Sequence, residues 1–168
     1  MGLILSIFFF TLNDLEDRYI IEFSNIEFYS YALLEDIQAV NTDAVGAIDI
    51  NTNEFLIKIP VASFEFPNKL MQKHFNDSYL ETDIYPESIF KGKIVEGYAN
   101  GELTLHGKTN KVNIPIEFNN DGDKIRISTS FNIFLKDYKI KIPKILFKNI
   151  AEEIEVTVNS TFKKYEIE

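Results

Sequence analysis

The sequence predicts an all-β fold, an antiparallel barrel of about eight strands with one or two short helices. Apolar and polar residues alternate over several runs, which is the period of a strand with one buried face. No βαβ rhythm appears, so the sheet is expected to be antiparallel. Turn residues such as Asn-Asn-Asp-Gly at 119–122 separate the runs. Closure into a barrel would remove the sheet edges, and a two-sheet sandwich is the alternative architecture.

The composition is that of one acidic domain. The chain has 168 residues, a formal net charge of −9, 15 Phe and no Cys. This length favours a single domain that buries roughly 68–70% of its unfolded surface, enough for a core without disulfides. The negative charge argues against nucleic acid as a partner, because affinity for phosphate backbones depends on Lys and Arg. The lack of Cys excludes thiolate metal sites and thiol nucleophiles.

Residues 1–12 are set apart from the predicted domain at 13–168, because residues 2–12 form an uncharged and mostly apolar run. A bilayer span needs about 20 apolar residues, so this run is too short to cross one. It has the length of the apolar part of a signal peptide, but no A-x-A cleavage pattern follows it. We expect either the remnant of an export signal, whose basic start lies upstream, or a first strand or helix of the barrel. Export implies a periplasmic or secreted protein, and a cytoplasmic location stays open.

Strand-like runs are predicted at 18–24, 26–31, 45–51, 54–61, 88–95, 102–105, 112–118, 125–135 and 154–162. In the first run, Tyr19, Ile21 and Phe23 are expected on one face. The alternation is strongest in 125–135, where six residues should face inward: Ile125, Ile127, Thr129, Phe131, Ile133 and Leu135.

The period changes from strand to helix between residues 67 and 76. Pro67 suits the first position of a helix. Four residues then recur at helical spacing and should share one face: Leu70, Met71, His74 and Phe75. A second helical turn is predicted at 143–149, around Leu146.

Three segments resemble elements of the YceI-like family. Residues 102–109, Glu-Leu-Thr-Leu-His-Gly-Lys-Thr, are similar to its "L-T-hydrophobic-H-G-x-T" hairpin. Residues 74–92 resemble an element that contains "Y-P-x-x-x-F", and 137–140 resemble an Asp-Tyr/Phe-Gly-Ile stretch in which Lys139 replaces the usual Gly. The matching region covers residues 44–164. The resemblance implies a lipocalin-like barrel that holds a long isoprenoid or a similar lipid in its interior.

On this resemblance we expect binding, storage or transport of a long apolar ligand such as a polyisoprenoid, without catalysis and without a cofactor. Apolar inward faces suit such a ligand, because each CH₂ removed from water contributes about 0.8 kcal/mol. The alternatives are a structural or interaction domain whose barrel is filled by its own Phe and Ile side chains, and an enzyme acting on a lipid. The residues expected to bind the ligand are Phe55, Ile57, Ile59, Leu70, Met71, His74, Phe75, Phe90, Leu103, Leu105, Ile125, Ile127, Phe131, Ile133 and Leu146.

Catalytic and metal-binding motifs are missing from the sequence. The chain has two histidines, His74 and His106, and neither has a recognised metal-ligand spacing to nearby carboxylates. His74 is expected to cap the helix face or to hydrogen-bond a ligand head group, and His106 to have a structural role at its hairpin turn. There is no G-x-S-x-G elbow and no P-loop.

A cluster of five lysines lies near the end of the predicted 125–135 strand. Alternation with Ile140 and Ile142 favours the solvated face of a strand, and transient contact with an anionic membrane is the functional alternative. A homodimer is a further open possibility. The five residues are Lys136, Lys139, Lys141, Lys144 and Lys148.

Overall fold

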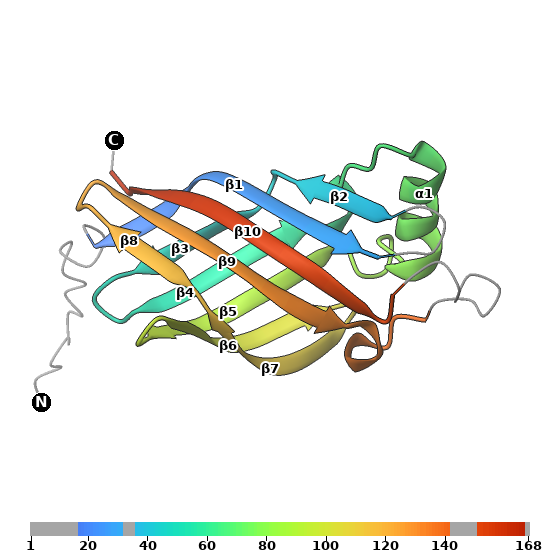
Figure 1. Cartoon of the computed structure of the whole chain (residues 1–168). Coiled ribbons are helices and arrows are strands. Elements are labelled where there is room, and N and C mark those ends of the chain that lie inside the picture. The colour runs from blue at the N-terminus through green and yellow to red at the C-terminus, as the bar shows by residue number, and fades with distance from the viewer. Residues whose placement is uncertain (1–16, 32–35, 142–150, 167–168) are drawn as a thin grey trace, which may run out of the picture.

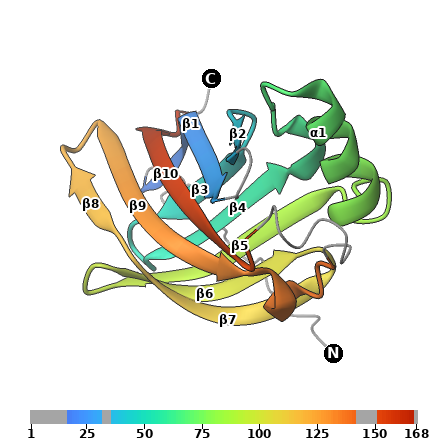
Figure 2. The ribbon, with the colours of Figure 1, turned by 45° about the vertical axis from the view of Figure 1, so that its right-hand side comes forward.

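In the computed structural model, which describes residues 17–31, 36–141 and 151–166, one antiparallel sheet of ten strands curls strongly into a half-barrel. A helical segment covers one end of it (Figures 1 and 2). The predicted all-β, antiparallel fold with a short helix is confirmed. The sheet has ten strands where a barrel of about eight was predicted, and it curls into a half-barrel. Among the described residues, no helix has the length and apolar character that a membrane span requires.

The strands follow one another across the sheet mostly as hairpins. Their order is β7-β6-β5-β4-β3-β1-β10-β9-β8, and β2 pairs with the second half of β1. Helix α1 (Lys69–His74) continues into a single π-helical turn (Phe75–Tyr79), and both follow β4 and precede β5 in the sequence. The strands are β1 (Arg18–Ser30), β2 (Ile37–Asn41), β3 (Val45–Asp49), β4 (Glu54–Pro60), β5 (Glu87–Val95), β6 (Tyr98–Leu105), β7 (Lys108–Pro115), β8 (Glu117–Asn120), β9 (Lys124–Phe134) and β10 (Glu153–Lys164).

The hairpin expected from the 102–109 motif is present between β6 and β7. Its turn consists of His106 and Gly107, with φ of 49° and 67°. Two consecutive positive φ values match the right-handed twist of the flanking strands. Such turns favour glycine, because glycine adopts positive φ without steric cost. Gly107 has a second reason to be glycine, because an added Cβ would lie 2.5 Å from the Tyr85 ring.

The prediction of two strands at 18–24 and 26–31 is wrong, because both belong to β1. The register of β1 against β10 shifts between Ile21 and Phe23. An extra residue at this β-bulge inverts the alternation that follows it. Tyr19 before the bulge is buried, and so are Ser24 and Ile26 after it, whereas Phe23 points outward with 55% of its surface exposed.

The helix begins two residues later than predicted. Asn68 caps it, since its side-chain oxygen accepts hydrogen bonds from the backbone N–H groups of Leu70 and Met71 at 3.0 and 3.2 Å. Met71 and Phe75 face the sheet, while Leu70 and His74 point to solvent. The predicted shared face therefore divides into two pairs, each with the four-residue spacing of one helix face.

The segment after β9 differs from the predicted strand. β9 ends at Phe134, and residues 135–138 form a 3₁₀ turn. Lys139 follows with φ of 55°, a left-handed conformation that glycine adopts without steric cost. The placement of Lys139 on the wet face of a strand was wrong, and its conformation explains why a glycine suits this position in the resembling family. The predicted helical turn at 143–149 and the predictions for residues 1–12 lie outside the described residues.

In the described structure β7 does not pair with β9 as neighbouring strands, and hydrogen bonds of side chains connect the two regions instead. The Thr129 hydroxyl donates to the Pro115 carbonyl at 2.6 Å, and the Asn110 amide donates to the Asp137 carbonyl at 2.8 Å. His106 Nδ1 lies 3.1 Å from the Tyr138 carbonyl oxygen. These contacts hold the two sides of the curled sheet around a common interior.

Candidate functional site

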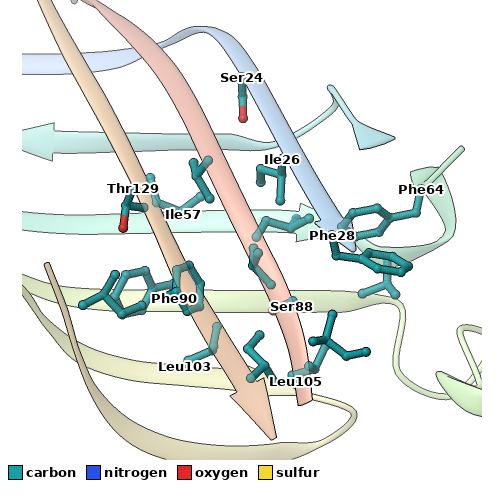
Figure 3. Close-up of a pocket in the computed structure, with 18 of the residues that line it drawn as sticks. Ser24, Ile26, Phe28, Ile57, Phe64, Ser88, Phe90, Leu103, Leu105 and Thr129 are labelled. Carbon is teal, nitrogen blue, oxygen red and sulfur yellow. The ribbon is translucent and has the colours of Figure 1, made fainter. Parts of the chain in front are cut away.

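An apolar cavity of about 240 Å³ lies inside the curled sheet (Figure 3). A void of about 10–15 Å³ already suffices for one water molecule, so this space is far larger than a packing defect. Side chains from strands on both sides of the half-barrel line it, together with side chains from the helical segment. The interior is therefore hollow rather than filled by its own side chains.

Most residues predicted to bind the ligand line this cavity. They come from β4, β5, β6, β9 and the helical segment, and they alternate with solvent-facing residues along each strand. No described residue of the lining is charged. The predicted residues that the structure brings together are Phe55, Ile57, Ile59, Met71, Phe75, Phe90, Leu103, Leu105, Ile127, Phe131 and Ile133.

Three of the predicted residues are described and do not line the cavity. Leu70 is 64% exposed and His74 is also exposed, since both lie on the outer face of α1. Ile125 points inward but is fully buried in a packed cluster with Tyr19 and Phe162, so it supports the end of the cavity rather than its surface. Leu146 lies outside the described residues.

The Ser and Thr hydroxyl groups in the lining are bonded within the wall. Ser88 Oγ donates to the Thr104 carbonyl at 2.8 Å, and Ser24 and Ser160 bond to each other at 3.3 Å. Ser30 Oγ accepts from the Ala151 N–H, and the Thr129 hydroxyl is held by the contact with β7 described above. Because these groups have protein partners, the surface that they leave for a ligand is apolar.

Sequence reasoning missed the aromatic end of the cavity. Phe28, Phe64, Phe66 and Phe75 form one cluster next to α1. Phe28 stacks on Phe75 with centroids 5.5 Å apart, and Phe66 lies 4.9 Å from Phe75 and 5.7 Å from Phe28. Phe64 completes the cluster at 5.3 Å from Phe28. The period-two pattern of Ser24, Ile26 and Phe28 could have indicated Phe28, whereas Phe64 and Phe66 lie in an irregular connection without a pattern.

Two buried tyrosines lie beside the cavity. Burial raises the pKa of Tyr79, which lines the cavity. Burial also raises the pKa of Tyr138, with a smaller opposing contribution from a hydrogen bond to Asn110. Both groups therefore stay neutral to a higher pH than an exposed tyrosine does.

The two histidines lie outside the cavity lining. His106 is mostly buried in its hairpin turn, where Nε2 lies 2.8 Å from Glu81 Oε2 and the ring packs on Tyr85 at 4.6 Å. This matches the structural role expected for it. In the described part of the chain, no group of three or more His, Cys, Asp or Glu residues is arranged to hold a metal ion.

The lysines predicted to contact a membrane are only partly described. Lys136, Lys139 and Lys141 are exposed, and Lys136 Nζ lies 5.7 Å from the centre of the Phe134 ring. Lys144 and Lys148 lie outside the described residues. Lys136 lies in the 3₁₀ turn after β9, and Lys139 and Lys141 follow that turn.

Comparisons with known proteins agree with the fold. The YceI-like domain matches residues 22–162. A solved polyisoprenoid-binding domain from Saccharophagus degradans, implicated in plant cell wall breakdown, superposes with a TM-score of 0.75 at 14% identity, over 88% of this chain and 98% of that one. Burkholderia cenocepacia BcnA gives 0.71 at 16% identity over 82% and 95%, and a Campylobacter jejuni YceI protein gives 0.58 at 21% identity over 74% and 81%. No curated protein sequence is significantly similar to the chain.

Proposed function

We propose that this chain, which belongs to the YceI-like domain family, binds a long, neutral, apolar lipid of the polyisoprenoid class in its cavity and stores or carries it. The observation that carries the proposal is the chemistry of the cavity wall. The described lining is apolar apart from hydroxyl groups, and the Ser and Thr hydroxyls are bonded within the wall. The similarity to a polyisoprenoid-binding domain supports the same class of ligand.

Hydrophobic transfer alone can supply the affinity. An isoprene unit has five carbons, so burying one gains about 4 kcal/mol at about 0.8 kcal/mol for each carbon. Association costs about 4–15 kcal/mol in lost translational and rotational freedom. A chain that buries two to four isoprene units therefore offsets this cost without any polar contact.

The wall chemistry favours neutral lipids over fatty acids. A carboxylate buried without a partner carries a large desolvation cost. The described lining offers no cationic side chain that could pair with it. It also contains no carboxylate or imidazole that could act as a general acid or base, which supports binding rather than turnover.

Two further parts of the proposal concern the cell. The apolar run at 2–12 supports export to the periplasm or beyond, and fractionation of the native host would test it. The exposed Lys136, Lys139 and Lys141 support transient contact with an anionic membrane. Changing Lys136 and Lys139 to Glu should weaken association with anionic liposomes, and unchanged association would remove this part.

Lipid uptake by the delipidated full-length protein tests the main proposal. The protein is incubated with phosphatidylcholine vesicles that contain a polyprenol, or with palmitate as the charged control. Lipid is then quantified by mass spectrometry after gel filtration. The expected result is about one polyprenol for each protein chain and little palmitate. Palmitate uptake at the same level would contradict the charge argument, and uptake of neither lipid would contradict the proposed function.

A further inference from the structure

The two ends of the cavity differ in construction. At the end remote from α1, the strand register brings together Tyr19, Ile125 and Phe162, which are at most 2% exposed. The Tyr19 hydroxyl also donates to the Gly122 carbonyl at 2.6 Å. Passage of a ligand through this end would require the paired ends of β1, β9 and β10 to separate.

The other end is covered by residues 61–86, which we call the cover segment (Figure 2). It contains α1, and no residue of that helix is buried. The Val61 N–H donates to the Pro86 carbonyl at 2.9 Å, so the two ends of the segment are joined to each other beside the sheet. The cover segment is therefore a loop that is closed at its base.

Polar contacts hold the cover segment to the sheet at two places in the described structure. Val40 and Glu65 exchange backbone hydrogen bonds of 3.1 and 2.8 Å, which tie the start of the segment to β2. The contact of His106 with Glu81 ties its far part to the β6–β7 turn. Apolar packing supplies the rest of the closure. Phe64, Phe66 and Phe75 of the cover segment meet Phe28 of β1 at one side. At the other side, Val61, Tyr79 and Leu80 pack in a buried cluster with Leu103, Tyr138 and Ile140.

Packed rings can separate without leaving a polar group unpaired. Two local features also favour opening at this place. Phe75 begins the π-helical turn, in which the Leu80 N–H donates to the Phe75 carbonyl at 2.9 Å. Such turns occur frequently at functional sites. The neighbouring Asn76 Oδ1 is buried and has no hydrogen-bond partner in the described structure. Opening the segment would give this oxygen access to water, which offsets part of the lost packing.

We propose that the cover segment moves away from β1 and that the cluster of Phe28, Phe64, Phe66 and Phe75 is the portal through which an apolar lipid enters and leaves. This inference rests on the proposed function and adds the route to the site. The aromatic rings close this end of the cavity and offer an apolar surface to a chain that passes between them.

A disulfide across the Val40–Glu65 pair tests this portal. These residues form a hydrogen-bonded antiparallel pair, whose Cα atoms are typically about 5.5 Å apart, within the range that a disulfide spans. The chain has no Cys, so the V40C/E65C variant carries one thiol pair. The control is K124C/K163C, a paired position between β9 and β10 at the opposite end. Polyprenol uptake from vesicles is followed in time, with and without reductant.

We expect oxidised V40C/E65C to take up polyprenol at least tenfold more slowly than its reduced form, and the control to show no such difference. F64A, which removes one ring of the portal, should instead speed uptake several-fold. Equal uptake rates for oxidised and reduced V40C/E65C, or slower uptake by F64A, would overturn the portal. The proposed function would still hold in that case if the final amount of bound polyprenol were about one for each chain. Absence of uptake by every form, wild type included, would overturn both.

Discussion

Substitution of Ala99 by Leu distinguishes a hollow interior from a filled one, because it should raise the stability of the first and lower the stability of the second. Ala99 on β6 is 6% exposed, lines the cavity and pairs with Ile94 and Ile114 on the neighbouring strands. The larger side chain adds three carbons, which we expect to point into the cavity that Ala99 lines. Their burial contributes about 2.4 kcal/mol at about 0.8 kcal/mol each. Loss of rotamer freedom costs about 0.5–1 kcal/mol.

The net expectation is that the ligand-free variant is about 1.5 kcal/mol more stable than the wild type. For a chain of this size that corresponds to a rise in Tm of about 3–6 °C, measured by differential scanning calorimetry after delipidation. The variant should also take up less polyprenol, because its side chain occupies ligand space. In a filled interior the same substitution would overpack the core and cost about 1–3 kcal/mol.

Ala39 provides the matched control for this prediction. It is 1% exposed on β2 and does not belong to the cavity lining. Replacing it by Leu should lower Tm, since the added carbons meet packed neighbours. A decrease in Tm for both variants would refute the hollow interior, whereas opposite signs would support it.

Three further predictions concern the backbone and the buried tyrosines. Gly92→Ala should lower the free energy of unfolding, measured in urea, by about 1–3 kcal/mol, because the added Cβ would lie 2.0 Å from the Asn100 carbonyl oxygen. An unchanged free energy of unfolding would contradict this contact. Lys139→Gly should raise the free energy of unfolding by up to about 1 kcal/mol, because glycine adopts the left-handed φ of 55° without strain. A lower free energy of unfolding would contradict that strain. Burial raises the pKa of Tyr138, so the unfolded chain loses this proton first, near pH 10, and the free energy of unfolding should fall as pH rises beyond that value. Tyr138→Phe should make that fall shallower in urea titrations between pH 8 and 11, and an unchanged slope would contradict it.

Strict alternation made much of the sheet predictable. In β4 and β9 every second residue faces the interior, so Phe55, Ile57, Phe131 and Ile133 could be placed from the sequence. The same rule failed in β1, where the bulge before Phe23 inverts the faces. A bulge depends on pairing with another strand, and one sequence alone does not reveal that pairing.

The aromatic end of the cavity depends on contacts that local patterns do not encode. Phe64 and Phe66 lie in an irregular connection, and they reach the cavity because Glu65 between them bridges to Val40. In α1, helical spacing correctly indicated one amphipathic turn, but it could not decide between the pair Met71 and Phe75 and the pair Leu70 and His74. The sheet decides this, since only one of the two pairs faces it.

Mass spectrometry of the lipid extracted from the natively purified protein tests the central claim most directly. The protein is taken from its own host without detergent, dialysed and extracted with organic solvent. The hollow apolar cavity predicts one long neutral lipid in about equimolar amount, reduced in Ala99→Leu and retained by Lys136→Glu. A stable, monodisperse wild-type protein that carries no lipid, and takes none up from vesicles, would contradict the claim.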